Sequence, residues 1–196
     1  MSEITEFIEH YTPSGRERIS FAWNGKHAEE FVDANQSFRW SVVEECLANS
    51  ERVSLLLLED LFLADADWAI QAWGVPAHFA PLGGALLVRG GSAALESFSK
   101  GFNASFDTFG ACHEIQLPMG LLPSLVTSVR EMREHLTAEQ QKARLERTLE
   151  LFQKLERRAA AAGWVKIVPR TEVSDIGIVR PRWYRKAWGW FLRKSS

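Results

Sequence analysis

The sequence predicts a mainly α-helical protein, a compact domain of stacked helices with a minor β element. Apolar residues recur at intervals of three and four along most of the chain, which is the spacing of one helix face. These periodic segments are bounded by glycine, proline and capping residues. With 46% hydrophobic and 24% charged residues, the 196-residue chain can bury a core without disulfides or a metal.

Three helices are expected in the first fifty residues. Apolar spacing and a capping Ser2 predict the first over residues 3–11. A short helix is expected at 27–35. A better-defined one follows Ser37, because apolar residues then repeat every four positions, at Phe38, Val42 and Cys46.

Residues 51–73 form the most apolar predicted helix, with Ser50 as its cap. Its first half is apolar on nearly every side, which is typical of a helix buried in a core. Gly74 followed by Pro76 is a stop signal.

The middle of the chain is less regular. Residues 81–89 fit a short buried helix, but a buried strand over 85–88 fits equally well, and both interpretations stay open. Ser92 caps the next helix, the stretch 103–112 is expected to be irregular, and Pro123 starts a further helix.

The clearest helix start is the capping box at 137–140, Thr-Ala-Glu-Gln. The helix that follows runs to about Ala162, and Gly163 ends it. Pro181 opens a last short helix. Short strands are expected near 18–23, 114–117, 164–168 and 176–179.

No repeat of fixed period is present, so the sequence does not predict a HEAT-like array. We interpret residues 1–179 as a single helical domain. Residues 180–196 are interpreted as a basic, aromatic C-terminal helix that docks on this domain.

Charge is divided unevenly along the chain. The last 21 residues carry six basic residues and no acidic one, a net charge of +6, whereas the first 175 carry 17 basic against 25 acidic residues, a net charge of −8. Such asymmetry predicts a tail that binds an anionic partner or folds back on the acidic part. The start of the chain lacks the pattern of a signal peptide and no apolar stretch is long enough to span a bilayer, so we expect a cytoplasmic location.

The basic tail is the first candidate binding site. On a helical wheel its aromatic residues share one face and its basic residues lie mainly on the other. Docking of the aromatic face on the domain is the preferred interpretation, with an anionic membrane surface, nucleic acid or a protein partner as alternatives. The candidate partner- or surface-binding residues are Arg182, Trp183, Arg185, Lys186, Trp188, Trp190 and Arg193.

The acids of the 51–73 helix are the second candidate. Glu59 and Asp60 interrupt its most apolar stretch, and a buried acid needs a partner or has a raised pKa. Asp65 and Asp67 resemble a metal-binding Asp-x-Asp, but two residues at this spacing on a helix point apart. We expect these acids to be solvated or paired with bases.

Two other patterns favour structural roles. Cys112 and His113 are neighbours and would face opposite sides of an extended chain, so they do not form a nucleophile and its base. The glycine pairs 83–84 and 90–91 lack the spacing of a phosphate-binding loop and fit helix ends and close helix packing. We therefore expect no catalytic residue, metal or cofactor.

The sequence predicts a non-enzymatic intracellular binding or regulatory protein, of adaptor or immunity type, with a protein as its most expected partner. Eight tryptophans in the chain favour a binding surface. One alternative is a peripheral membrane or anionic-surface protein that acts through residues 180–194. The other is an enzyme that uses the acids of the 51–73 helix. Nucleic acid is the least favoured partner.

Overall fold

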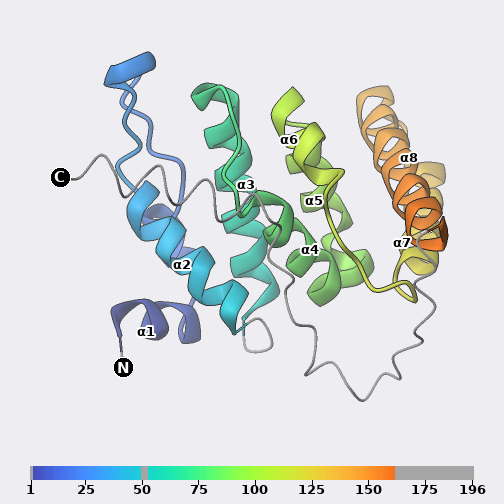
Figure 1. Cartoon of the computed structure of the whole chain (residues 1–196), viewed down its shortest axis with the longest axis horizontal. Coiled ribbons are helices and arrows are strands. Elements are labelled where there is room, and N and C mark those ends of the chain that lie inside the picture. The colour runs from blue at the N-terminus through green and yellow to red at the C-terminus, as the bar shows by residue number, and fades with distance from the viewer. Residues whose placement is uncertain (1, 50–52, 162–196) are drawn as a thin grey trace. The chain divides into compact units, whose positions relative to one another are not determined.

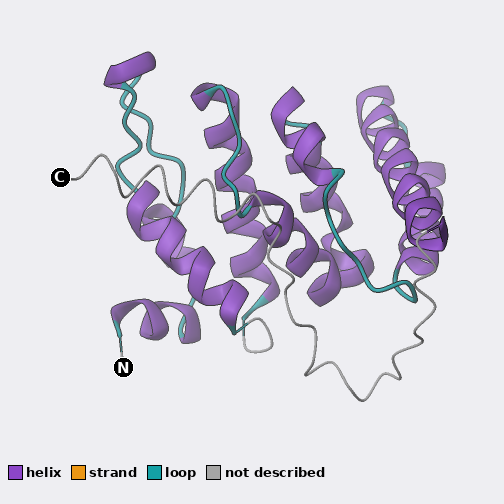
Figure 2. Cartoon of the chain, viewed as in Figure 1, coloured by secondary structure: helices purple, strands orange, loops and turns teal. Residues whose placement is uncertain are grey.

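The computed structural model describes residues 2–49 and 53–161, and these residues form helices joined by short loops (Figure 2). The mainly α-helical prediction is confirmed. The α-helices are α1 Glu3–Glu9, α2 Gln36–Ala48, α3 Leu55–Ala72, α4 Phe79–Gly90, α5 Leu95–Phe102, α6 Phe106–Cys112, α7 Leu122–His135 and α8 Glu139–Ala161. Short 3-10 helices are η1 Pro13–Arg18, η2 Ala28–Glu30 and η4 Gly91–Ala94.

The helices pack on one another largely in chain order (Figure 1). Helix α1 lies on α2, α3 contacts α2, α4 and α5, α5 contacts α6 and α8, and α7 packs along α8. These residues belong to a single compact unit. None of the helices in the described part of the chain is long and apolar enough to cross a membrane.

Helix α3 lies at the centre of the fold, as its apolar composition predicts. The side chains of Leu57, Leu58, Leu61 and Phe62 have no exposed surface. The hydroxyl of Ser54 accepts the backbone N–H of Leu57 and caps the helix, four residues after the expected start. Burial of four large apolar side chains on one helix contributes several kcal/mol, which fixes α3 in place.

Stacked phenylalanine rings connect α3 to its neighbours. Phe62 of α3 stacks on Phe79 of α4 with 4.5 Å between ring centroids, and on Phe98 of α5 with 5.6 Å. Phe98 in turn stacks on Phe152 of α8 at 5.7 Å. The core therefore continues without interruption from the centre of the fold to its C-terminal helices.

The predicted strand near 18–23 is wrong. Arg18 ends η1, and the N–H of Ala22 donates to the side chain of Asp33 at 3.0 Å instead of to a neighbouring strand. A single antiparallel bridge joins Trp23 to Asp33. The side-chain bond to Asp33 takes the place of the ladder bond that a strand would need, which local alternation could not reveal.

The predicted strand near 114–117 is also wrong. The N–H groups of Glu114 and Ile115 donate to the carbonyls of Ala111 and Cys112, so the chain continues to turn after α6. The predicted strands at 164–168 and 176–179 lie outside the described residues, as does the tail from residue 180.

Several helix boundaries differ from the expected ones. The stretch 103–112, expected to be irregular, contains α6, whose capping box joins Ser105 and Thr108. The helix expected over 27–35 shrinks to η2, and Ala28 there has φ +56°. Residues 81–89 are helical rather than a strand. Helix α8 starts one residue later than its predicted capping box requires, and the carbonyl of Ala138 accepts its first hydrogen bonds.

Close packing between α3 and α5 requires a glycine at position 101, and we expect Gly101→Ala to destabilise the protein by about 1–3 kcal/mol. A Cβ atom there would lie 2.5 Å from the ring of Phe62, which is itself wedged between Phe79 and Phe98. Urea unfolding followed by circular dichroism measures the loss.

Gly110→Ala is the matched control, because a Cβ at this helical position meets no atom within 4 Å. Alanine should stabilise α6 there by a few tenths of a kcal/mol to about 1 kcal/mol. Equal effects of the two substitutions would contradict the packing argument.

Candidate functional site

The predicted binding residues of the C-terminal tail lie outside the described residues. They are Arg182, Trp183, Arg185, Lys186, Trp188, Trp190 and Arg193, and their role in binding a partner or an anionic surface stays a prediction. The other candidates, on α3 and around Cys112, lie in the described part of the chain.

Asp60 is buried and joins α3 to the N-terminal segment. Its carboxylate accepts a hydrogen bond of 2.6 Å from the hydroxyl of Tyr11 and forms an ion pair of 2.8 Å with Arg16. Burial, together with the hydrogen bond to Asp60, raises the pKa of the Tyr11 hydroxyl. Asp60 is therefore paired with a base, as expected, and fixes α1 and η1 against the centre of the fold.

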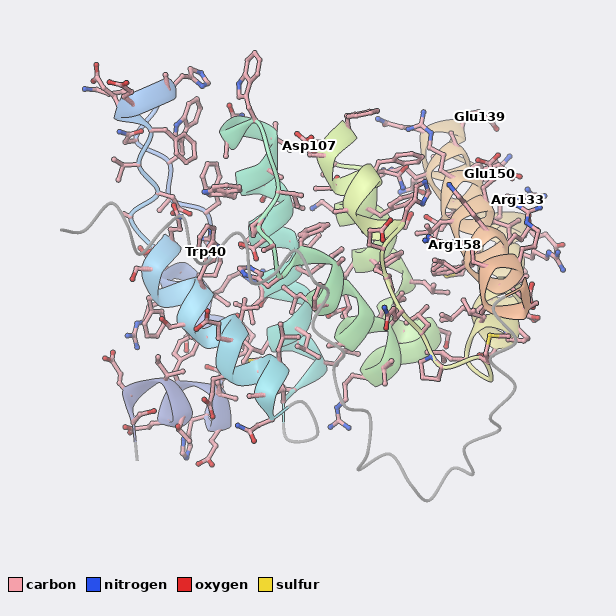
Figure 3. The ribbon with its side chains drawn as sticks, viewed as in Figure 1. Trp40, Asp107, Arg133, Glu139, Glu150 and Arg158 are labelled. Atoms are coloured by element: carbon pink, nitrogen blue, oxygen red, sulfur yellow. The ribbon has the colours of Figure 1, made fainter. Side chains whose placement is uncertain are left out.

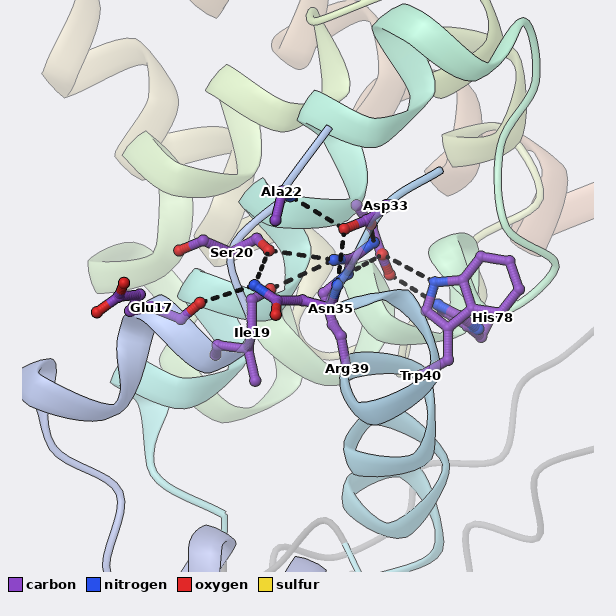
Figure 4. A network of polar contacts seen from close by, with 10 residues as sticks. Glu17, Ile19, Ser20, Ala22, Asp33, Asn35, Arg39, Trp40 and His78 are labelled. Atoms are coloured by element: carbon purple, nitrogen blue, oxygen red, sulfur yellow. Dashed lines mark hydrogen bonds and ion pairs between the residues drawn. The ribbon is translucent and has the colours of Figure 1, made fainter. Parts of the chain in front are cut away.

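Asp65, one turn further along α3, belongs to a different and fully buried network (Figure 4). Arg39 of α2 has no exposed surface and lies between two carboxylates. Its Nε donates to Asp65 at 2.8 Å, and its Nη2 donates to Asp33 at 2.6 Å. The indole Nε1 of Trp40 and the imidazole Nε2 of His78 also donate to Asp65, at 3.2 and 2.7 Å.

The network fixes the loop that precedes α2. Asp33 accepts the backbone N–H groups of Ala22 and Asn35, and the Asn35 amide donates to the carbonyls of Glu17 and Ser20. The bond within residues 33–35 is local, and the others join residues 17–22 to the start of α2. The polar groups are paired, which is the condition under which buried charge is tolerated.

The pKa of Asp65 lies below its ordinary value. Burial by itself would raise this pKa, but the hydrogen bonds and positive charge supplied by His78 and Arg39 outweigh burial. The carboxylate is therefore ionised over the ordinary working range of pH.

The remaining acids of α3 do not join these networks. Glu59 accepts a hydrogen bond from Ser97 at 3.0 Å. Asp67 lies on the exposed side of the helix, opposite to buried Asp65, as the two-residue spacing predicts. Partial desolvation raises the pKa of Asp67, and the charge of Lys100 opposes this effect. The described acids thus point to separate neighbours, and among the described residues no cluster has the composition of a metal site.

Cys112 and His113 have separate surroundings. Cys112 is buried, and burial raises the pKa of its thiol. The His113 ring packs edge-on against Phe109 with 4.8 Å between centroids. The glycines at 83 and 84 pack α4 closely against other elements, and a Cβ at Gly83 would lie 3.0 Å from Phe62. The close-packing interpretation of this pair is confirmed.

A series of aromatic rings leads from the buried network to the surface. Trp40 contacts Trp68 at 5.6 Å between centroids, Trp68 contacts Phe31 at 6.0 Å, and Phe31 stacks on Phe21 at 6.2 Å. Phe21 stacks on Trp23 at 6.5 Å. The last rings belong to the loop that carries η2, so the buried network and this loop form one continuous structure.

Exposed apolar side chains lie on the same loop and at the end of α3. The loop with η2 and the C-terminal end of α3 project from the same end of the helices (Figure 1). Trp73 is 89% exposed, Val32 54% and Ile70 47%. We call the aromatic edge the set of residues Phe21, Trp23, Phe31, Val32, Trp68, Ile70 and Trp73.

The position of Trp73 is fixed by the backbone. Trp73 follows the last residue of α3 and has φ +54°, in the left-handed region that ends a helix. Glycine is the usual residue there, and a tryptophan at this position costs about 1–2 kcal/mol of backbone strain. An indole that is both strained and exposed contributes little to folding and is the strongest candidate for a contact with a partner.

The sequence contained a signal for the Arg39 network that was not used. Arg39 occupies the same helical face as Val42, Val43 and Cys46, all of them buried. A base on an apolar face requires a buried acid, and Asp65 was the matching acid on α3. The sequence does not show that Arg39 pairs with Asp65, because the two residues are 26 positions apart.

Searches of family models, curated proteins and solved structures found no match to this chain. The function is therefore inferred from the geometry of these residues alone.

Removal of the central base should unfold or strongly destabilise the protein. We expect Arg39→Met to cost about 3–5 kcal/mol, because it leaves buried Asp33 without its base and removes one of the two partners that neutralise Asp65. Arg133→Met is the matched control, since the ion pair of Arg133 with Glu146 is partly exposed and should be worth less than about 1 kcal/mol. Urea unfolding of both variants tests this, and similar losses would refute the central role of Arg39.

The depressed pKa of Asp65 predicts a pH dependence. Its folded-state pKa lies below the unfolded-state value of about 4, so its stabilisation is complete above that pH and is lost as the pH falls through the folded-state pKa. The difference in unfolding free energy between wild type and Asp65→Asn should be constant from pH 7 to about 5 and shrink below about 4. A difference that does not shrink would show that ionised Asp65 is not what stabilises the fold.

Proposed function

We propose that this chain is a non-enzymatic intracellular binding or regulatory protein that holds a protein partner through the aromatic edge. The observation that carries the proposal is the exposure of Trp73, Val32 and Ile70 beside a continuous series of packed rings. Tryptophan is among the few residue types that supply most of the binding energy in protein interfaces. An adaptor or an immunity-type protein requires a surface of this kind.

The way the edge is held supports the same proposal. Its loop is fixed to α2 and α3 by the Arg39 network rather than by an extensive apolar core of its own. A loop held in one conformation pays little entropy when a partner binds. The many buried bonds around Asp33 are therefore consistent with a surface that is preorganised for contact.

The charge of the surrounding part favours a basic partner. Residues 1–102 contain seven basic and fifteen acidic residues, a net charge of −8, so the acidity of the chain is concentrated in the part that includes the edge. Glu29, Glu30 and Asp67 are exposed on the segments that form it. A partner with a positively charged rim around an apolar centre matches these features.

The test compares full-length variants in affinity capture from an extract of the source cells, followed by binding measurements with the purified captured protein. We expect Trp73→Ala and Ile70→Asp to weaken binding by about thirtyfold or more, the loss of one interfacial hot spot. Binding of the wild-type protein should also weaken as ionic strength rises, because the partner is basic.

Val88→Ala is the control, because Val88 is 38% exposed but lies on α4 and belongs to neither the edge nor its loop. A chain that lacks residues 180–196 forms the third comparison. Equal capture by Trp73→Ala and wild type would refute the proposal. Loss of capture only on removal of 180–196 would assign binding to the tail instead.

A further inference from the structure

A cavity of about 440 Å³ opens between the C-terminal end of α5, α6 and α8. It lies on different helices from the aromatic edge, so an inference about it does not rest on the proposed function. Its walls combine two rings, two polar side chains and one base, and the lining residues are Asn103, Ser105, Phe106, Phe109 and Arg147. A volume of this size holds one small organic molecule or one to two residues of a peptide.

The apolar wall of the cavity has one fixed ring and one exposed ring. Phe109 stacks on Phe102 with 5.1 Å between centroids and meets His113 at 4.8 Å, which holds it in place. Phe106 is 86% exposed at the start of α6. An exposed phenylalanine beside a fixed one offers a surface for an apolar group of a ligand.

The opposite wall belongs to a cationic face of α8. The spacing of its residues places five side chains on one face, four of them basic: Arg144, Arg147, Leu151, Lys154 and Arg158. None of these four bases has a carboxylate within ion-pair distance among the described residues. In contrast, Arg133 and Lys142 are paired with Glu146 and Glu139.

Further observations concern the polar groups beside this face. The Nε of Arg144 is buried and has no hydrogen-bond acceptor among the described residues, and the side-chain oxygen of Asn103, on the cavity wall, is buried without a donor. Burial and the charges of Lys154 and Arg158 also lower the pKa of His113. A buried donor without an acceptor, placed beside several bases, can be satisfied by a bound anion.

We propose that this cavity binds a carboxylate attached to an apolar group, with Arg147 holding the carboxylate and Phe106 and Phe109 covering the apolar group. A single arginine at the cavity suits a monoanion, and its planar guanidinium matches a carboxylate with two hydrogen bonds. The two sources of such a group are a free organic acid and the C-terminal residue of a peptide.

The experiment is isothermal titration of the full-length protein with three probes. They are N-acetylphenylalanine, a hexapeptide of alanines ending in phenylalanine with a free carboxyl group, and the same hexapeptide ending in a carboxamide. Saturable binding of at least one free acid, with binding of the carboxamide at least about tenfold weaker, is the expected result. Binding of the first probe alone identifies a free acid as the ligand, and tighter binding of the peptide identifies a chain terminus.

Variants assign the binding to the cavity. Arg147→Ala should weaken binding of the free acid by about tenfold or more, and Phe106→Ala by a few-fold, and both residues are exposed so that the fold survives. Arg130→Ala, an exposed base on α7, is the control for the loss of one charge and should bind as wild type does. Absence of saturable binding of either acid, equal binding of acid and carboxamide, or an unaltered Arg147→Ala variant would overturn the proposal.

Discussion

The fold of the N-terminal part depends on one buried guanidinium. Arg39 has no exposed surface, and its two carboxylate partners come from the loop before α2 and from the middle of α3. Taking three charged groups out of water is costly, and only complete pairing offsets the cost. Backbone N–H groups bind the second oxygen of Asp33, and the imidazole of His78 binds the second oxygen of Asp65. The indole of Trp40 shares the first oxygen of Asp65 with Arg39, so each carboxylate has several partners. The energy of the network is therefore lost as a unit when one member is removed.

This network performs the role that an apolar core performs elsewhere in the chain. From Phe62 to Phe152 the helices are held by stacked rings and buried leucines. The loop of residues 20–34 has little buried apolar surface, and its order comes from Asp33 and Asn35. Apolar packing tolerates small shifts, whereas paired charges with directional hydrogen bonds fix both distance and orientation. The loop that carries part of the aromatic edge is therefore held by contacts that fix both distance and orientation.

The sequence predicts the helices and exposures that depend on local spacing, and it misses the contacts that depend on pairing of residues distant in the chain. The apolar run of α3 and the stop signal after it place this helix to within a few residues, and the spacing of Asp65 and Asp67 correctly separates a buried from an exposed acid. The strand near 18–23 fails because a distant side chain, Asp33, satisfies its backbone. Helix α6 was missed because its cap is a Ser–Thr pair rather than Ser with glutamate or glutamine. The only sequence indication of the aromatic edge is the high tryptophan content, because the exposure of Trp73 depends on the position of the C-terminal end of α3 in the folded chain.

The distribution of charge gives the two proposed sites opposite preferences. All of the net negative charge of the chain before the tail lies in residues 1–102, and residues 103–161 carry eight bases and eight acids. Within that neutral part four bases of α8 share one face of the helix, whereas Glu139 and Glu146 pair with Lys142 and Arg133. Figure 3 labels Arg158 of α8 and Asp107 of α6. The edge lies on the loop before α2 and on the C-terminal half of α3, and the cavity on α5, α6 and α8, with the phenylalanine core between them. A basic protein bound at the aromatic edge leaves the cavity open to an acid. A rigid body with two separate and oppositely charged contact surfaces is what an adaptor requires.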